Sequence, residues 1–405
     1  MSTSDIPGRD DLARLDAGDP LAAHRAEFDL PEGVLYFDGN SLGAQPHRSV
    51  ERIEAVRRQW RDDLINAWNQ HRWIHLPREM GARIAPLIGA DADEVAVADS
   101  TSVNLFKIVA AALRLRPDRR VIVSERDNFP SNIYMTQGLI DLLGRDHELR
   151  LAEPGAVDVC IDDDVAVVCL THVNFRTGAM HDLPAVTERT RAVGAISVWD
   201  LSHSAGSVPI DLDAADVDLA TGCGYKFLNG GPGAPSFFYV NRRLHHSWAQ
   251  PLTGWLGHAA PFDFVPDYEP APGIARGLCG TPPILSMASL DAALEIFDGV
   301  DMEQVRAKSV RLGELFLELV EGRCAAHGFD VVCPREADRR GSQVCLGHPE
   351  GYRIMRALID CGVIGDFRAP NVLRFGLTPL YQRYVDVYDA VETLREVMDG
   401  ELWRD

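Results

Sequence analysis

The sequence predicts an α/β protein with a mostly parallel sheet between layers of helices, followed by a smaller α+β region. Over the first two thirds of the chain, short and almost wholly apolar segments alternate with helical patterns. This alternation is typical of buried parallel strands joined by helices. From residue 284 onward the pattern changes to a long helical segment and then to shorter strands. Because such parallel sheets bind ligands at the carboxyl ends of their strands, functional residues are expected at those ends.

The individual elements follow from β-branched runs such as VIVS and VAVVCL and from apolar residues at helical spacing. Strands of the main sheet are expected over 95–98, 121–124, 165–170, 195–199, 217–221 and 236–240. Its helices are expected over 102–114, 131–144 and 183–193, and in pieces over 48–88. In the C-terminal region we expect one continuous helix over 284–321, strands over 344–347 and 372–377, and a last helix over 384–398.

Length and composition indicate a globular protein with more than one domain. The chain has 405 residues, which at about 150 residues per domain gives two or three domains. Hydrophobic residues make up 46% and charged residues 25%, which excludes a disordered chain. The 40 basic and 60 acidic residues give a net charge of −20. Nucleic acid and anionic membranes are therefore not expected as partners, because basic clusters supply the affinity for both.

The cysteines and the N-terminal segment indicate a reduced, cytoplasmic protein. No two of the eight cysteines have C-x-x-C spacing, so no metal site is expected. Most lie in apolar runs and are interpreted as buried thiols. The first 20 residues are acidic and lack the apolar core of a signal peptide, and no apolar run approaches the roughly 18 residues of a membrane span.

The segment 200–233 contains the strongest chemical signal. Asp200 ends an apolar strand pattern, and a second apolar run leads to Tyr225 and Lys226 in a glycine-rich loop. Burial favours the uncharged lysine amine, which can form a Schiff base with an aldehyde. A buried carboxylate can keep the pyridine nitrogen of pyridoxal phosphate protonated. Taken singly, Asp200 could instead cap a helix and Lys226 could lie on the surface. The occurrence of both residues at strand ends in one segment favours the cofactor site.

Several upstream residues fit the same cofactor, although each also has an ordinary structural explanation. The segment DSTSVN (99–104) places hydroxyls at a strand-to-helix junction, where they suit either a phosphate or a helix cap. Phe129 follows a strand and suits either stacking on a pyridine ring or core packing. Thr171 and Asn174 follow another strand and suit either hydrogen bonds to the cofactor or a loop cap.

Eight motifs in order resemble those of kynureninases, which are fold type I pyridoxal phosphate enzymes related to aspartate aminotransferase, and they resemble the bacterial type most. The resemblance extends over nearly the whole chain. The motifs are YFDGNSLG (36–43), FPSNIY (129–134), HVNFRTG (172–178), WDLSHSAG (199–206), CGYKFLNGGPG (223–233), GWLGH (254–258), GTPPIL (280–285) and VIGDFRAPNVLRFGLTPLY (363–381).

The resemblance implies roles for individual residues. Lys226 would form the covalent link to the cofactor aldehyde, Asp200 would pair with the pyridinium nitrogen, and Tyr225 would touch the phosphate and transfer protons. Arg374 would hold the α-carboxylate of the substrate, a task that suits its planar, bidentate donor group. Further cofactor contacts within the subunit would come from Thr101, Ser102, Phe129, Asn132, Thr171 and His203.

The resemblance also implies a homodimer with the active site at the subunit interface. Trp255 and Thr281 match residues that reach the cofactor of the partner subunit. Two positions are noteworthy. Asn132 stands where the family often has Asp, which removes a charge from the local polar network. Thr281 stands where animal forms carry Asn, which favours kynurenine over its 3-hydroxylated form.

The domains implied are an N-terminal arm (1–60) packed with the small domain, a large cofactor domain (61–285) and a small domain (286–405). The implied activity is hydrolysis of L-kynurenine, and of 3-hydroxy-L-kynurenine, to anthranilate or 3-hydroxyanthranilate and L-alanine, in tryptophan degradation or NAD biosynthesis. A cysteine desulfurase or selenocysteine lyase is the alternative, with Cys324, Cys333 or Cys345 as nucleophile on a mobile loop. A non-catalytic binding protein of the same fold is a third interpretation.

Overall fold

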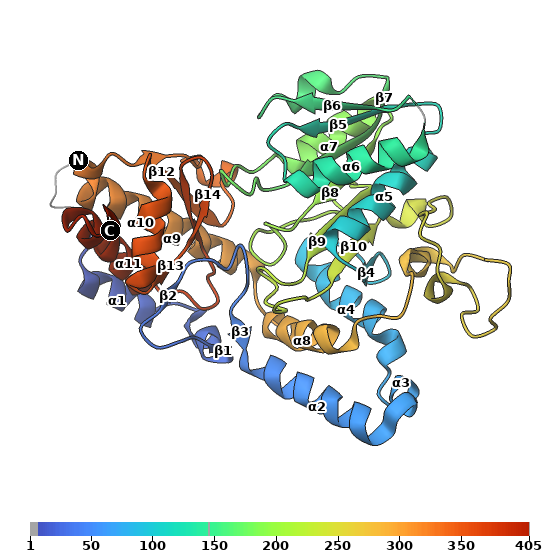
Figure 1. The fold of residues 1–405 in the computed structure, drawn as a ribbon, viewed down its shortest axis with the longest axis horizontal. Helices are drawn as coiled ribbons and strands as arrows, with labels where there is room; N and C mark the ends of the chain where they lie inside the picture. The colour runs from blue at the N-terminus through green and yellow to red at the C-terminus, as the bar shows by residue number, and fades with distance from the viewer. Residues whose placement is uncertain (1–6, 145, 405) are drawn as a thin grey trace.

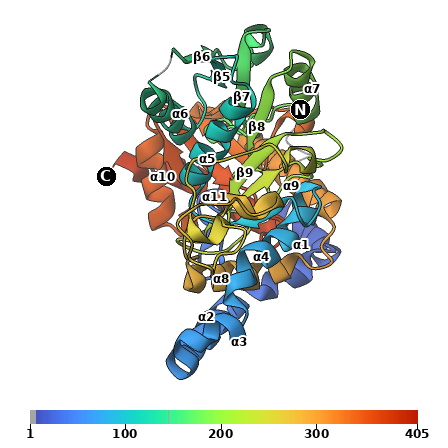
Figure 2. The same ribbon diagram turned by 90° about the vertical axis from the view of Figure 1, so that its right-hand side faces the viewer.

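The computed structural model describes residues 7–144 and 146–404, which form two lobes joined by the N-terminal segment and by the chain near residue 300 (Figure 1). The larger lobe contains a seven-stranded sheet, and the smaller lobe contains a four-stranded sheet. Viewed from the side, the helix pair α2 and α3 projects away from the rest of the larger lobe (Figure 2). Among the described residues, no helix combines the length and the apolar character needed to cross a bilayer.

The large sheet is mostly parallel, as the apolar strand pattern predicts. Its spatial order is β4-β10-β9-β8-β7-β5-β6, and β10 pairs antiparallel with both of its neighbours. Every residue of β7 and β8 is buried, because helices cover both faces. The strands are β4 (Val95–Val97), β5 (Val121–Glu125), β6 (Glu148–Ala152), β7 (Val165–Thr171), β8 (Ile196–Asp200), β9 (Leu219–Cys223) and β10 (Ser236–Val240).

Two helices of the larger lobe, α5 and α7, begin at side-chain caps. Ser100 accepts a hydrogen bond from the Val103 amide at the start of α5, and Asp182 accepts one from the Ala185 amide at the start of α7. The helix α8 packs along α2 below the sheet (Figure 1). The helices are α2 (His47–Asp63), α3 (Ala67–Gln70), α4 (Leu76–Ile84), α5 (Thr101–Leu115), α6 (Pro130–Leu143), α7 (Leu183–Ala192) and α8 (Ile284–Leu294).

The smaller lobe has its own hydrophobic core between an antiparallel sheet and three helices. The sheet order is β11-β12-β15-β14. Its strands are β11 (Asp330–Val331), β12 (Gln343–Gly347), β14 (Asp366–Arg368) and β15 (Val372–Gly376). Its helices are α9 (Met302–Arg323), α10 (Gly351–Asp360) and α11 (Tyr384–Asp399).

The N-terminal segment contacts both lobes. The helix α1 (Arg9–Ala17) packs on α11, and β2 (Leu35–Tyr36) pairs in parallel with β13 (Val363–Ile364) of the smaller lobe. Strands β1 (Phe28–Asp29) and β3 (Gln45–Pro46) pair with each other just before α2. The domain boundaries at residues 60 and 285 remain a prediction.

Several features differ from the sequence-based expectations, which included neither the helices α1 and α10 nor the short strands β1, β2, β3, β11, β13 and β14. The expected helix over 284–321 is wrong as one element, since it is divided into α8 and α9. The break includes Gly299, whose φ of +80° is a left-handed conformation that interrupts a helix. The strand β6 was not expected, because it lies at the sheet edge and its ELRLA sequence is only partly buried.

Candidate active site

The carboxyl ends of β7 and β8 and the loop after β9 surround a cavity of about 160 Å³. Nine of the residues predicted for the cofactor line this cavity, although they come from five segments of the chain. They are Thr101, Ser102, Phe129, Asn132, Thr171, Asp200, His203, Tyr225 and Lys226. The structure therefore brings together the residues that the motifs single out for one strand-end site.

Lys226 lies in the glycine-rich loop that follows β9. Its Nζ is 2.9 Å from Nε2 of His203 and 5.9 Å from the centre of the Phe129 ring. Burial, followed by the charges of Lys226 and Arg374, holds the pKa of His203 well below its usual range. A neutral imidazole therefore faces the lysine side chain and can form a hydrogen bond with it.

The Lys226 loop is held in place by the N-terminal segment. The amide of Gly43 donates a hydrogen bond to the carbonyl of Tyr225. A Cβ atom at Gly43 would lie 2.4 Å from the Lys226 carbonyl oxygen, so only glycine permits this approach. The GNSLG motif thus packs directly against the loop that carries the lysine.

Asp200 is buried at the end of β8 and belongs to a polar network. Its Oδ1 accepts from the Ser202 amide at 2.9 Å, and its Oδ2 accepts from Asn132 Nδ2 at 3.1 Å. The same Asn132 amide group lies 3.0 Å from Oγ1 of Thr171. An amide at position 132 therefore donates to Asp200, which a carboxylate could not do unless it were protonated.

The first turn of α5 provides hydrogen-bond donors to the same cavity. Thr101 and Ser102 occupy its first two positions, where backbone amides lack partners within the helix. The hydroxyl oxygen of Thr101 is buried without a hydrogen-bond partner. Amides at a helix N-terminus together with an unpaired hydroxyl fit a bound phosphate group.

Two further side chains complete the walls of this cavity. Phe129 is 39% exposed and is held edge-to-face by Phe175, with ring centres 5.1 Å apart, so a planar ligand can stack on it. Burial, with smaller contributions from Cys223 and Asp200, raises the pKa of Tyr225. Its phenol is therefore protonated at neutral pH and can donate a hydrogen bond.

Arg374 does not line this cavity but belongs to a cluster of charged groups that contacts Phe175, which does line it. Its guanidinium donates to both carboxylate oxygens of Asp366, with 2.6 Å from Nε to Oδ1, and to the carbonyl of Phe175. It also donates to Oγ of Ser41 at 3.1 Å. The arginine side chain is 1% exposed. Its donors are thus mostly occupied within the chain itself.

Trp255 and Thr281 are the two predicted cofactor residues that lie apart from this cavity. Trp255 contacts Phe262, with ring centres 5.8 Å apart, and Thr281 is exposed. Asn174, which the sequence suggested as a cofactor contact, instead bonds Asp127 through its side-chain amide at 2.8 Å.

Sequence reasoning missed several residues that support the site. Asn128 accepts from Thr171 Oγ1 and donates to Ser124, and Phe175 supports Phe129. Ser41 and Asp366 surround Arg374. The sequence signal for Ser41 and Asp366 was their presence in the GNSLG and GDFRAPN motifs, whereas nothing in the sequence pattern pointed to Asn128.

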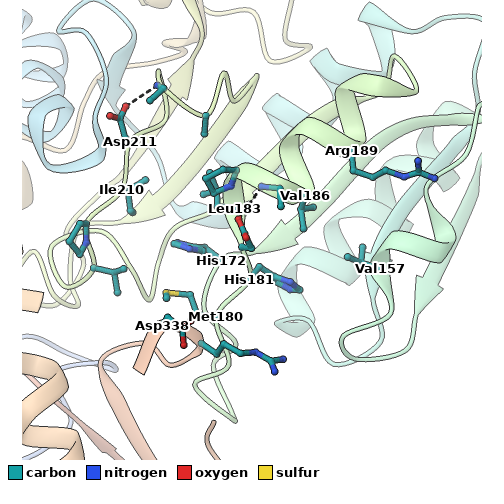
Figure 3. Close-up of a pocket in the computed structure, with 18 of the residues that line it drawn as sticks. Val157, His172, Met180, His181, Leu183, Val186, Arg189, Ile210, Asp211 and Asp338 are labelled. Carbon is teal, nitrogen blue, oxygen red and sulfur yellow. Dashed lines mark hydrogen bonds between the residues drawn. The ribbon is translucent and has the colours of Figure 1, made fainter. Parts of the chain in front are cut away.

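A larger cavity of about 1020 Å³ lies beside the same strand ends (Figure 3). It is lined by residues such as His172, Met180, His181, Leu183 and Ile210. Because adjacent residues of an extended strand point to opposite sides, His172 faces this cavity while Thr171 faces the smaller one. The larger cavity contains none of the predicted cofactor residues, so the chemistry favours the smaller one.

The three cysteines suggested for a desulfurase are buried. Cys324, Cys333 and Cys345 are 1%, 4% and 0% exposed. Burial raises the pKa of all three thiols, that of Cys324 to about 12. Since the thiolate is the nucleophile, none of the three has the environment of a reactive cysteine.

Comparison with known proteins identifies the family that the chain resembles. Residues 305–394 match the model of the kynureninase C-terminal domain. The chain is 54% identical over 402 residues to a kynureninase of Burkholderia mallei (strain SAVP1), covering 98% of this chain and 97% of that protein. It is 51% identical over 401 residues to a kynureninase of Pseudomonas fluorescens, covering 98% and 96%.

Solved structures agree on the fold. A cysteine desulfurase of Thermococcus onnurineus NA1 superposes with a TM-score of 0.78 at 20% identity, covering 93% of this chain and 98% of that chain. The cysteine desulfurase CsdA of Escherichia coli superposes with a TM-score of 0.74 at 19% identity, covering 94% and 98%. At these identities the likeness extends to the fold alone. The near full-length identity to the curated relatives shows that this chain belongs to the kynureninase family.

Proposed function

We propose that this protein is a pyridoxal phosphate-dependent hydrolase that cleaves the Cβ–Cγ bond of L-kynurenine to give anthranilate and L-alanine. Membership of the kynureninase family supports the reaction class. The observation that carries the proposal is the single cavity that Lys226, Asp200, Phe129 and Thr101 line together. The aldehyde, the ring nitrogen, the ring face and the phosphate of pyridoxal phosphate need an amine, a carboxylate, an aromatic ring and a hydroxyl, in that order.

In this proposal the chain holds the cofactor at four points. Amides and hydroxyls at Thr101 and Ser102 would bind the phosphate, and Phe129 would contact the ring. Asp200 would hold a proton on the ring nitrogen, while Asn132 and the Ser202 amide fix the orientation of its carboxylate. When bound, pyridoxal phosphate supplies an electron sink for charge developing on the substrate.

The protein's own groups then move protons and hold the substrate. Nζ of Lys226 takes the α-proton, and neutral His203 at 2.9 Å accepts a hydrogen bond from the resulting ammonium. The Tyr225 phenol, which stays protonated at neutral pH, acts as a proton donor in later steps, directly or through water. Arg374 binds the α-carboxylate and so orients the α-proton toward Lys226.

Assembly and location are also part of the proposal. Trp255 and Thr281 lie away from the cavity of their own chain and are assigned to the site of a partner subunit in a homodimer. The protein is proposed to act in the cytoplasm, in tryptophan degradation or NAD biosynthesis, on kynurenine in preference to 3-hydroxykynurenine. The proposed domains are an N-terminal arm (1–60), a large cofactor domain (61–285) and a small domain (286–405).

A side-by-side assay of both kynurenines with purified holoenzyme tests this function. Release of anthranilate, followed by its fluorescence, is expected from L-kynurenine, with slower release of 3-hydroxyanthranilate from the hydroxylated substrate. Release of sulfide from L-cysteine without anthranilate would instead favour the desulfurase alternative. The burial of Cys324, Cys333 and Cys345 argues against that outcome.

A further inference from the structure

Asp366 and Arg374 form a buried pair across two strands of the smaller lobe. The residues face each other directly in the antiparallel pairing of β14 with β15. Their side chains are 14% and 1% exposed. Asp366 Oδ1 accepts from Nε of Arg374 at 2.6 Å, and Asp366 Oδ2 accepts from Nη2. The carboxylate thus occupies the side edge of the guanidinium with both oxygens.

The remaining contacts restrict the guanidinium further. Of its five N–H donors, two reach Asp366, one reaches Ser41 Oγ at 3.1 Å and one reaches the carbonyl of Phe175. One N–H on Nη1 has no such contact. Nη1 contacts the carbonyl of Phe175, a residue that lines the cavity containing Lys226, so this contact links the Nη1 end of Arg374 to the cavity wall. The group cannot rotate without breaking its bonds to Asp366.

The charges around Asp366 leave the cluster receptive to an anion. Arg368 Nη2 lies 2.8 Å from Asp366 Oδ2, and Ser41 donates to the same oxygen at 2.8 Å. Two guanidinium groups therefore surround the ionised carboxylate of Asp366, which leaves a net excess of one positive charge while the neighbouring Asp38 is protonated. The attraction of a substrate carboxylate to the guanidinium groups of Arg368 and Arg374 offsets its repulsion from Asp366.

We propose that Asp366 is a positioning residue for substrate recognition, which holds the side edge of Arg374 so that the Nη1 end is presented to the α-carboxylate of the amino-acid substrate. This inference rests on the proposed function, since it assumes that Arg374 binds that carboxylate. Asp366 itself does not touch the substrate. Its effect is exerted only on ligands that carry an α-carboxylate.

The test uses Asp366→Asn in the holoenzyme and two ligands that differ only in the α-carboxylate. These are L-kynurenine and its decarboxylated amine, kynuramine, used as a competitive inhibitor. The variant should raise KM for L-kynurenine about tenfold and change kcat by less than about threefold. The inhibition constant of kynuramine should stay the same, because that ligand does not need Arg374.

Two further variants separate positioning from loss of stability. Asp386→Asn is the matched control, because Asp386 is 4% exposed at its side chain and also pairs with two arginines, Arg25 and Arg383, in another part of the molecule. It should lower the unfolding temperature without changing KM. Ser41→Ala keeps the ion pair but removes one contact of Arg374, so it should raise KM for L-kynurenine about threefold. This variant replaces Asp366→Asn as the test if Asp366→Asn does not fold.

The outcomes are distinguishable. Equal weakening of both ligands would indicate general damage and overturn the inference, as would an unchanged KM. A lower KM in Asp366→Asn would show that Asp366 competes for Arg374 instead of positioning it. Absence of any kynurenine turnover by the native holoenzyme would overturn the proposed function, and this inference with it.

Discussion

The cavity at the ends of β7 and β8 and the charge cluster around Arg374 are assembled in different ways. The cavity takes its residues from strand ends and helix starts of one sheet, each next to a recognisable secondary-structure boundary. The cluster joins Ser41 of the N-terminal segment, Phe175 of a loop and Asp366 of the smaller lobe. Chemistry at the first region depends on local geometry, whereas recognition at the second depends on contacts between distant segments. Substitutions in the cavity should therefore affect turnover, and substitutions in the cluster should affect substrate affinity.

Lys226→Ala should have the largest effect, because it removes both the covalent attachment and the base. We expect kynurenine cleavage to fall by about 10³-fold or more and the visible absorbance of the linked cofactor to disappear. Absorbance spectra after dialysis and an anthranilate assay measure both. Retained linkage and turnover would contradict the assignment of Lys226.

Asp200→Asn should have the next largest effect. Loss of the buried charge that is proposed to face the ring nitrogen should lower kcat by about 10²- to 10³-fold, with cofactor still bound because the proposed phosphate contacts at Thr101 and Ser102 are untouched. Cofactor content and kcat are measured together. A normal kcat would show that the carboxylate at the end of β8 does not set the protonation of the cofactor.

Asn132→Ala should give an intermediate effect within the same cavity. It removes the donor that lies 3.1 Å from Asp200 Oδ2 and 3.0 Å from Thr171 Oγ1, and it leaves each of these groups with one hydrogen bond fewer. We expect kcat/KM to fall about tenfold. Thr136→Val is the comparison variant. Thr136 lies in the same helix and donates a hydrogen bond to the carbonyl of Asn132, four residues earlier, so its replacement should lower kcat/KM much less.

The cluster around Arg374 should respond to pH through Asp38. Burial, followed by the charge of Asp366, raises the pKa of Asp38 to about 7. The charged and polar groups that face it are Asp366, Arg374, Arg368 and Ser41. As pH rises through 7, ionisation of Asp38 removes the net positive charge of the cluster.

KM for L-kynurenine is therefore expected to rise above pH 7, and Asp38→Asn should remove this rise. Ionisation of Asp38 should also reduce stability. Because the folded state favours protonated Asp38, the contribution of this group to the free energy of unfolding falls as pH rises from about 4 to 7. A KM that follows the same pH dependence in both proteins would rule out Asp38 as its source.

Cys345→Ala should have the smallest effect on activity. The thiol is fully buried and its pKa is raised by burial, so it contributes packing and not nucleophilic chemistry. Kynurenine cleavage should stay within about twofold of the native rate, with a small loss of thermal stability. A large loss of activity with an unchanged fold would reopen the desulfurase alternative.

The sequence predicts the cavity well and the cluster poorly, for a physical reason. Asp200, Lys226, Thr101 and Phe129 each stand beside an apolar run or a helix start, and parallel sheets bring such positions to one edge. No local pattern shows that Asp366 faces Arg374, since this depends on the register of a short antiparallel pair. The break between α8 and α9 was missed for a similar reason, because one left-handed Gly299 outweighs a continuous helical pattern.

The structure of the holoenzyme with a non-cleavable kynurenine analogue tests most directly whether the two regions act on one substrate. The α-carboxylate of the analogue is expected within hydrogen-bond distance of the Nη1 end of Arg374, and its α-carbon next to Nζ of Lys226. An analogue bound with its carboxylate away from Arg374, for example in the larger cavity near His172, would contradict this expectation.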